Sequence, residues 1–183
     1  MKAIFRINRA LLDEIHSDLN RRHPFAVERV GFIACGAAAL PDGYLLLAQS
    51  YHPVADEHYE EDLLVGAMMG SNAIRKSLQL AYQEPVSMFH VHRHEHRGKP
   101  HFSRVDVQES ARFVPDFWKV RPNKPHGAIV LSHDSMSGAW WNPESKKAQS
   151  FAEMAVIGRP TFTYREEAWT LADRVSLAPT AMM

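Results

Sequence analysis

The chain has 183 residues, of which 45% are hydrophobic and 23% charged, an ordinary composition for a globular protein that buries a sizeable core. Its 21 basic and 21 acidic residues balance, which argues against a nucleic-acid or acidic-membrane partner held by overall charge. The first residues lack the apolar region of a signal peptide, and no run of about eighteen apolar residues suggests a membrane span. We therefore expect one cytoplasmic domain over residues 1–183, with the last ten or so residues flexible and no nucleic-acid or membrane partner.

The first third of the chain predicts one helix and two strands. Asn8 can cap a helix that ends near Arg22. The apolar residues of this helix share one face: Leu11, Leu12, Ile15 and Leu19. The apolar segments 27–40 and 44–54 flank the turn signal Pro41-Asp42-Gly43, which predicts two adjacent strands.

A long helix is predicted next, over residues 60–83. Its apolar residues recur at helical spacing: Leu63, Leu64, Ala67, Met68, Ile74, Leu78 and Tyr82. The stretch 55–62 holds five carboxylates in eight residues, which is typical of an acidic first turn that the helix dipole favours. Contact with a basic partner segment is the alternative explanation for these charges.

The rest of the chain alternates strands with one more helix. Residues 84–92 have a strand pattern, and Ser103 with Asp106 marks the start of a helix. Further strands are predicted within residues 126–134, 136–143 and 160–169. The whole order of elements predicts an α/β fold with a mixed β-sheet flanked by helices.

A stretch rich in histidine, residues 87–110, holds five of the eleven histidines. On a strand, His90 and His92 lie on the same face and can aim at one point, while Asp106 lies one turn into the following helix. Two imidazoles and one carboxylate leave a tetrahedral position open, as in catalytic zinc sites. The single cysteine, Cys35, excludes a four-cysteine zinc site.

Each part of this pattern also has a plainer explanation. His94, His96 and His101 are crowded with basic residues, which is typical of a solvated loop, and we do not expect them to bind metal. Ser103 and Asp106 are compatible with helix capping alone. The metal-site hypothesis depends on their combination with a strand-borne pair of histidines.

Together these residues resemble the JAMM motif of the JAB/MPN metalloproteases, which is His-x-His, a spacer, Ser-x-x-Asp, and an upstream glutamate. In "ERVGFIACG", Glu28, Gly31 and Gly36 match the family's glutamate segment. The order of predicted elements agrees over residues 5–142 as well. The resemblance implies a JAB/MPN (cytidine-deaminase-like) mixed sheet flanked by helices.

The resemblance also implies a role for each matched residue. His90, His92 and Asp106 would bind Zn²⁺, Glu28 would be the general base, and Ser103 would stabilise the oxyanion. Zinc would lower the pKa of a bound water and polarise the scissile carbonyl. The implied activity is that of a zinc-dependent isopeptidase or peptidase, which cleaves the bond after the C-terminal tail of a ubiquitin-like modifier.

The loop after the histidines departs from the family pattern in two ways. Arg93 stands where the family usually has proline, and thirteen residues instead of ten separate His92 from the aspartate. The pairs His92/His94 and His94/His96 would leave eleven and nine. Because the longer loop costs only about 0.2 kcal/mol in closure entropy, we keep His90 and His92, whose neighbours continue the apolar strand.

Small stand-alone JAB proteins of this size resemble bacterial members encoded with a ubiquitin-like protein and its E1-like and E2-like enzymes, and these are the expected partners. Some such systems act in antiviral defence and others process sulfur-carrier proteins, and both roles stay open. Two alternatives are a non-catalytic MPN scaffold and a histidine-rich metal-binding or sensing module. The complete set of motif residues argues against the scaffold.

Overall fold

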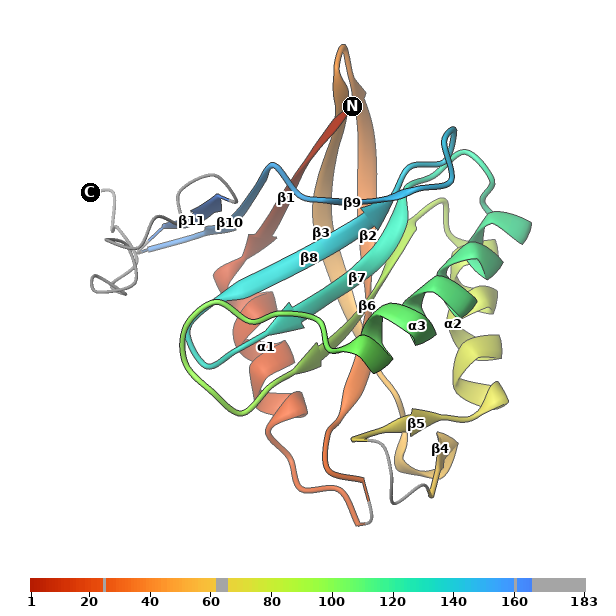
Figure 1. The fold of residues 1–183 in the computed structure, drawn as a ribbon, viewed down its shortest axis with the longest axis vertical. Coiled ribbons are helices and arrows are strands. Elements are labelled where there is room, and N and C mark those ends of the chain that lie inside the picture. Colours follow the sequence, from red (N-terminus) through yellow and green to blue (C-terminus); the bar gives the residue numbers. More distant parts are fainter. Residues whose placement is uncertain (25, 62–65, 160, 166–183) are drawn as a thin grey trace.

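The structure is a computed structural model that describes residues 1–24, 26–61, 66–159 and 161–165. Most of its strands belong to one sheet: β1 (Lys2–Asn8), β2 (Val30–Leu40), β3 (Gly43–Pro53), β6 (Ser87–Arg93), β7 (His126–Leu131), β8 (Met136–Trp141), β9 (Ala148–Ser150), β10 (Glu153–Ile157) and β11 (Phe162–Arg165). The sheet is mixed and curled, with the order β11-β10-β1-β3-β2-β6-β7-β8-β9 (Figure 1). A small separate hairpin pairs β4 (Tyr59–Glu60) with β5 (Met68–Met69).

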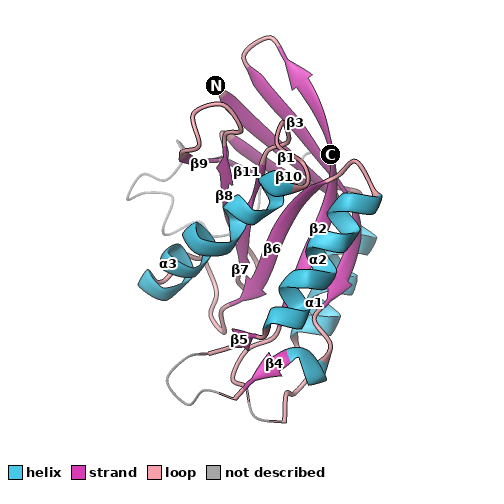
Figure 2. Cartoon of the chain, turned by 90° about the vertical axis from the view of Figure 1, so that its right-hand side faces the viewer, coloured by secondary structure: helices cyan, strands magenta, loops and turns pink. Residues whose placement is uncertain are grey.

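Helices cover both faces of the sheet. The described α-helices are α1 (Arg9–Leu19), α2 (Ser71–Gln83) and α3 (Arg104–Phe113), and two short 3₁₀ helices are η1 (Asp56–His58) and η2 (Val114–Lys119). Figure 2 shows α1 and α3 on opposite sides of the sheet, with β6 and β7 between them. The predicted α/β class, a mixed sheet between helices, is confirmed.

Strand β6 separates two apolar cores, one on each face of the sheet. Phe89 and Val91 belong to the core under α1, whereas Met88 belongs to the core under α2 and η2. This alternation follows from the two-residue period of a strand, and it was predicted from the sequence. His90 and His92 therefore lie on the face that α2 and α3 cover.

The N-terminal helix forms as predicted, but a strand precedes it. The Asn8 side chain accepts a hydrogen bond from the Leu11 N–H at 2.8 Å, and the helix ends at Leu19, three residues before the predicted end. No strand was predicted for residues 2–8, yet β1 lies between β3 and β10 and pairs in parallel with both. Its short alternation of buried Ala3, Phe5 and Ile7 was the available signal.

The predicted long helix over residues 60–83 is wrong in its first half. Helix α2 begins only at Ser71, and residues 68–69 are a strand of the small hairpin. Glycine favours such a break because it costs about 1 kcal/mol in a helix interior, and the Gly70 N–H instead donates to the His58 carbonyl. The acidic stretch therefore does not cap this helix, while predicted helix positions 62–65 lie outside the described residues.

The strands predicted around residues 27–54 and 126–143 are confirmed as the antiparallel pairs β2–β3 and β7–β8. Strands β9 and β10 were not predicted. Of the predicted strand 160–169, the structure shows β11, while residues 160 and 166–169 lie outside the described part, as does the predicted flexible end. Among the described residues, no helix combines the length and apolar character needed to cross a membrane.

Candidate metal centre

The candidate site lies where β6 ends. Strand β6 runs parallel to β7, and the ladder continues beyond Arg93 because the His94 N–H donates to the Leu131 carbonyl at 2.9 Å. One step further, the His133 N–H donates to the His96 carbonyl, also at 2.9 Å. His94 is thus held like a strand residue, and the two-residue period brings it to the same side as His92.

Three donor atoms converge at this point. The Nε2 atoms of His92 and His94 are 3.2 Å apart. The Oδ2 atom of Asp106 lies 3.4 Å from the His92 nitrogen and 3.6 Å from the His94 nitrogen. The three atoms form a nearly equilateral triangle, contributed by the end of a strand and the start of a helix.

The N-terminus of α3 fixes the carboxylate in this triangle. Ser103 is the N-cap, and its Oγ accepts a hydrogen bond from the Asp106 N–H at 3.1 Å. In return, the Ser103 N–H donates at 2.6 Å to Oδ2 of Asp106, the same oxygen that faces the histidines. The capping box therefore does two things: it caps α3, and it orients Oδ2 of Asp106 toward the two imidazoles.

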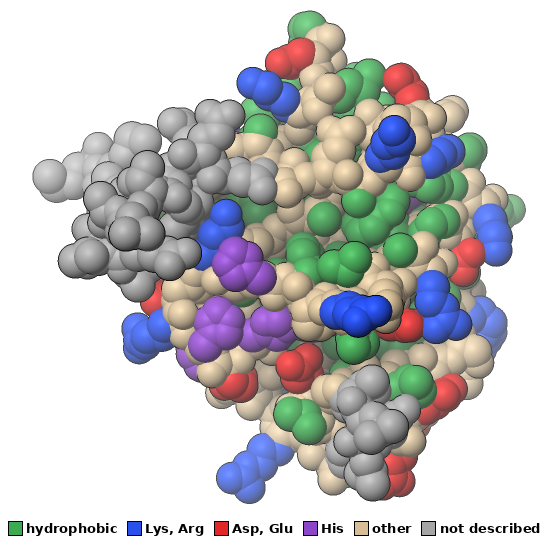
Figure 3. Space-filling view, viewed as in Figure 1, with side chains coloured by type: hydrophobic (Ala, Val, Ile, Leu, Met, Phe, Trp, Pro, Cys, Tyr) green, Lys and Arg blue, Asp and Glu red, His purple; other side chains and the backbone are tan. Residues whose placement is uncertain are grey.

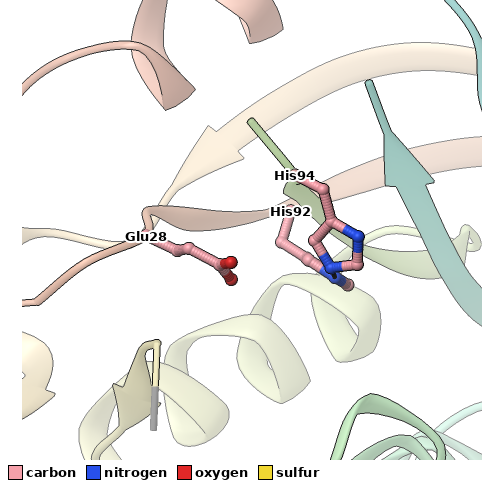
Figure 4. A group of neighbouring side chains, drawn as sticks. All are labelled: Glu28, His92 and His94. Atoms are coloured by element: carbon pink, nitrogen blue, oxygen red, sulfur yellow. Dashed lines mark hydrogen bonds between the residues drawn. The ribbon is translucent and has the colours of Figure 1, made fainter. Parts of the chain in front are cut away.

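Glu28 lies just before the neighbouring strand, β2. In the β2–β6 register Val30 is opposite His92, and Glu28, two residues before Val30, faces the end of β6. Its carboxylate points toward His92 and His94, and the nearest donor atoms of these three residues lie within 4.8 Å of one another (Figure 4). The Gly66 carbonyl accepts from the Glu28 N–H at 2.9 Å and holds the backbone there.

The Gly66 backbone packs closely against the Glu28 side chain. A Cβ atom at this position would lie 3.0 Å from the carboxyl carbon of Glu28. The glycine therefore permits the close approach of the β5 segment to the site.

His90 is set back from the triangle. The centroid of its ring lies 5.5 Å from that of the His92 ring. The ring also makes edge-on contacts with the rings of Phe32 and Phe113, at centroid separations of 5.8 and 5.3 Å. The residue is only 9% exposed, and burial lowers the pKa of its imidazole to about 3. Neither ring nitrogen of His90 has a hydrogen-bond partner among the described residues.

Burial and neighbouring charges shift the pKa values of the acidic groups and of one histidine in the site. Burial raises the pKa of Glu28, although the nearby His92 opposes the shift. Burial alone would also raise the pKa of Asp106, but the hydrogen bonds with His92 and Ser103 outweigh it and hold this pKa well below its usual range. Burial, followed by the charge of His92, lowers the pKa of His94. The site thus favours an ionised Asp106 and a neutral His94, the forms that bind metals.

A cavity of about 530 Å³ opens beside the triangle. Its walls come from the start of β2, the β5 segment, α2, β6 and α3. Glu28, His92, His94, Ser103 and Asp106 line one part of it. The remainder is lined by apolar side chains, among them Met69, Ile74, Val105 and Phe113, and by the polar or charged side chains of Glu109, Ser110, Arg112 and Asp116. The site is therefore accessible from a hollow whose size is typical of ligand pockets.

The loop between His94 and Ser103 is tied to the turn after β7. The Gly98 N–H donates to the Asp134 carboxylate and the Ser132 hydroxyl donates to the Gly98 carbonyl, both at 2.7 Å. Figure 3 shows histidine side chains gathered on this part of the surface. These hydrogen bonds anchor the loop, on which His96 and His101 are exposed.

The donor set fits a zinc ion. Tetrahedral zinc with bonds of about 2.0–2.1 Å has neighbouring donor atoms about 3.3–3.4 Å apart. The observed separations of 3.2, 3.4 and 3.6 Å among His92, His94 and Asp106 match that spacing. Nitrogen and carboxylate oxygen are also donors that zinc prefers.

All five residues singled out from the sequence line the cavity: Glu28, His90, His92, Ser103 and Asp106. The structure adds His94, which we assigned to a solvated loop and whose Nε2 lies 3.2 Å from that of His92. The ring of the predicted ligand His90 lies 5.5 Å from the His92 ring, between centroids. Two signals pointed to His94: the alternation of 90, 92 and 94, and the spacer of eleven residues before Asp106, closer to the family's ten. The continued β6–β7 pairing places His94 beside His92, and this pairing could not be predicted from the polar sequence of the loop.

The lone cysteine plays no part in this site. Cys35 is fully buried in β2, and burial raises the pKa of its thiol. A thiolate nucleophile is therefore disfavoured there.

The sequence matches no protein-family model and no curated protein. The function must be argued from the site itself.

Proposed function

We propose that the protein is a zinc-dependent peptidase or isopeptidase with a JAB/MPN fold, and that it cleaves the bond after the C-terminal tail of a ubiquitin-like protein. The observation that carries the proposal is the triangle of donor atoms from His92, His94 and Asp106, with the Glu28 carboxylate beside it. Two histidines and one carboxylate leave one tetrahedral position for water and substrate, as catalytic zinc sites require.

The motif pattern supports the same proposal in a corrected register. His92 and His94 serve as the His-x-His pair, Ser103 and Asp106 as the Ser-x-x-Asp, and Glu28 as the upstream glutamate. In this register the strand end carries both imidazoles, and the capping box of α3 carries the third ligand. In this proposal, His94 takes the ligand role that the family resemblance implied for His90.

Each residue then has a defined task. Zinc bound by His92, His94 and Asp106 would supply a water of lowered pKa and polarise the scissile carbonyl. Glu28 accepts the proton of the attacking water and returns it to the leaving amine, a role that suits a carboxyl group whose pKa burial raises.

Ser103 stabilises charge on the substrate. Its Oγ accepts from the Asp106 N–H, so the hydroxyl proton can be donated to the oxygen of the tetrahedral intermediate. Such a hydrogen bond contributes on the order of 3 kcal/mol to transition-state stabilisation in hydrolases.

The open cavity supports a polypeptide substrate. It extends from the donor triangle past apolar side chains of β5, α2 and α3, which suits an extended tail lying beside the metal. The proposed partners are a ubiquitin-like protein or its conjugate, together with E1-like and E2-like enzymes that would form the conjugate.

Two measurements test this function. Purified wild-type protein should contain one zinc per chain, and His92→Ala should contain none. Zinc-loaded protein should cleave at least one member of a panel of ubiquitin and small ubiquitin-like proteins, each fused through its C-terminal tail to a reporter, and Glu28→Gln should not. Wild type without stoichiometric zinc contradicts the metal site, whereas stoichiometric zinc with no cleavage of the panel favours a metal-sensing module.

A further inference from the structure

Three ring nitrogens behind the donor triangle lack a hydrogen-bond partner among the described residues. They are Nδ1 and Nε2 of His90 and Nδ1 of His92, and all three are shielded from solvent. The two rings are neighbours, tilted by 32° with centroids 5.5 Å apart. An unpaired buried polar group costs about 1–3 kcal/mol, so this pair of adjacent, unsatisfied imidazoles calls for a physical explanation.

The orientation of the His92 ring explains why its Nδ1 needs a hydrogen-bond acceptor. Because Nε2 of His92 is the atom that faces Asp106 and His94, Nδ1 carries the ring proton when Nε2 binds a metal. Metal-bound histidines nearly always donate that second N–H to a carboxylate, a carbonyl or water, which fixes the tautomer and the ring orientation. No carboxylate or carbonyl in the described residues accepts from Nδ1 of His92.

We propose that His90 is a positioning residue for the metal site: one water accepts the hydrogen bond of the His92 Nδ1–H and donates in turn to a ring nitrogen of His90. The inference rests on the proposed assignment of His92, His94 and Asp106 as ligands. A neutral imidazole has one acceptor nitrogen, and the ring separation is within reach of a single bridging water with partners on both rings. His90 then orients His92 while never touching the metal.

The surroundings of His90 favour this role over two others. As a direct ligand, His90 would need a nitrogen about 3.3 Å from its fellow donors. Neither of its ring nitrogens has a hydrogen-bond partner among the described residues, whereas Nε2 of His92 lies 3.2 Å from Nε2 of His94 and 3.4 Å from Oδ2 of Asp106. As a purely structural residue, it would be a poor choice, because an apolar side chain among Phe32 and Phe113 would avoid the unpaired nitrogens.

The test compares three variants as full-length zinc-loaded and metal-free protein. His90→Leu removes the acceptor, His90→Gln keeps a hydrogen-bonding group, and Met88→Leu is the matched control on the same strand and the same face. Zinc affinity is measured by competition with a chromophoric chelator, coordination by the absorption of the cobalt-substituted protein, and stability by urea unfolding of the metal-free protein. Nitrogen-15 NMR of the zinc-loaded wild type reports which nitrogen of His92 carries the proton.

We expect His90→Leu to weaken zinc binding about 10- to 100-fold, the usual effect of losing a residue that supports a ligand. His90→Gln should recover most of this affinity. Metal-free His90→Leu should unfold at no lower urea concentration than wild type, because an unsatisfied polar group is replaced by an apolar one. Met88→Leu should leave zinc affinity unchanged, and NMR should show the proton on Nδ1 of His92.

The outcomes separate this inference from the function on which it rests. Unchanged zinc affinity in His90→Leu overturns the inference and leaves the metal site intact. Loss of stoichiometric zinc and of the tetrahedral cobalt spectrum in both His90 variants makes His90 a ligand and also overturns it. A wild type that binds no zinc overturns the proposed function together with the inference.

Discussion

The two faces of β6 use one backbone for different purposes. On the α1 face, Phe89 contacts Phe5 and Phe151 at ring separations of 6.1 and 5.8 Å and fills a closed apolar core. On the opposite face, His92 and the following His94 meet Asp106 at the edge of an open cavity. Adjacent residues of one strand can therefore serve different purposes. The α1 face stabilises the fold, and the opposite face carries the candidate metal ligands.

The strongest test of this separation is the loss of His94. His94→Ala should abolish stoichiometric zinc binding and cleavage, because it removes one corner of the donor triangle while the α1-side core stays intact. His96→Ala, one strand period further along, is the control and should keep both. Metal analysis and circular dichroism of the two variants make the comparison. If His94→Ala retains its zinc, another residue, with His90 of β6 as the first candidate, must complete the ligand set.

Glu28→Gln should lower the cleavage rate about 10²- to 10⁴-fold, the usual contribution of a general base, while zinc stays bound. The amide is nearly isosteric with the carboxylate but cannot accept the proton of the attacking water. Glu95→Gln is the matched control, because Glu95 is an exposed carboxylate of the nearby loop that pairs with Arg93. Full activity in Glu28→Gln would assign the base to another group.

On the other face, Phe89→Ala should lower the free energy of unfolding by about 3–5 kcal/mol, because it leaves a cavity beside Phe5 and Phe151. Molecules that remain folded should bind zinc with wild-type affinity. Urea unfolding of the metal-free protein and zinc titration below the transition measure the two quantities separately. A parallel loss of zinc affinity in the folded state would show that the two faces of the strand are coupled.

These two faces also differ in how well the sequence predicts them. The alternation of Phe89 and Val91 with His90 and His92 follows from the period of a strand, and the Ser103–Asp106 capping box follows from its residue types. The end of the strand could not be predicted, because the backbone pairing that holds His94 depends on β7, a segment distant in sequence. Likewise, the break of the expected helix at Gly66 and Gly70 depends on hydrogen bonds with the segments around Glu28 and His58.

The smallest expected effect is the pH dependence of stability that Glu28 contributes. Burial raises the pKa of Glu28 in the folded protein above its ordinary value of 4.5. The unfolded chain therefore ionises first, and the contribution of Glu28 to stability is fully present below pH 4.5 and is lost as the pH rises through the raised folded value. In metal-free protein, Glu28→Gln should match wild type at low pH and become the more stable of the two as the pH rises across this window. Urea unfolding at a series of pH values measures the difference, with Glu57→Gln, at an exposed position away from the site, as the control carboxylate. A wild type that gains stability over Glu28→Gln across the same window would mean that the attraction of His92 exceeds the burial penalty, and the case for a proton-accepting carboxylate with a raised pKa would fail.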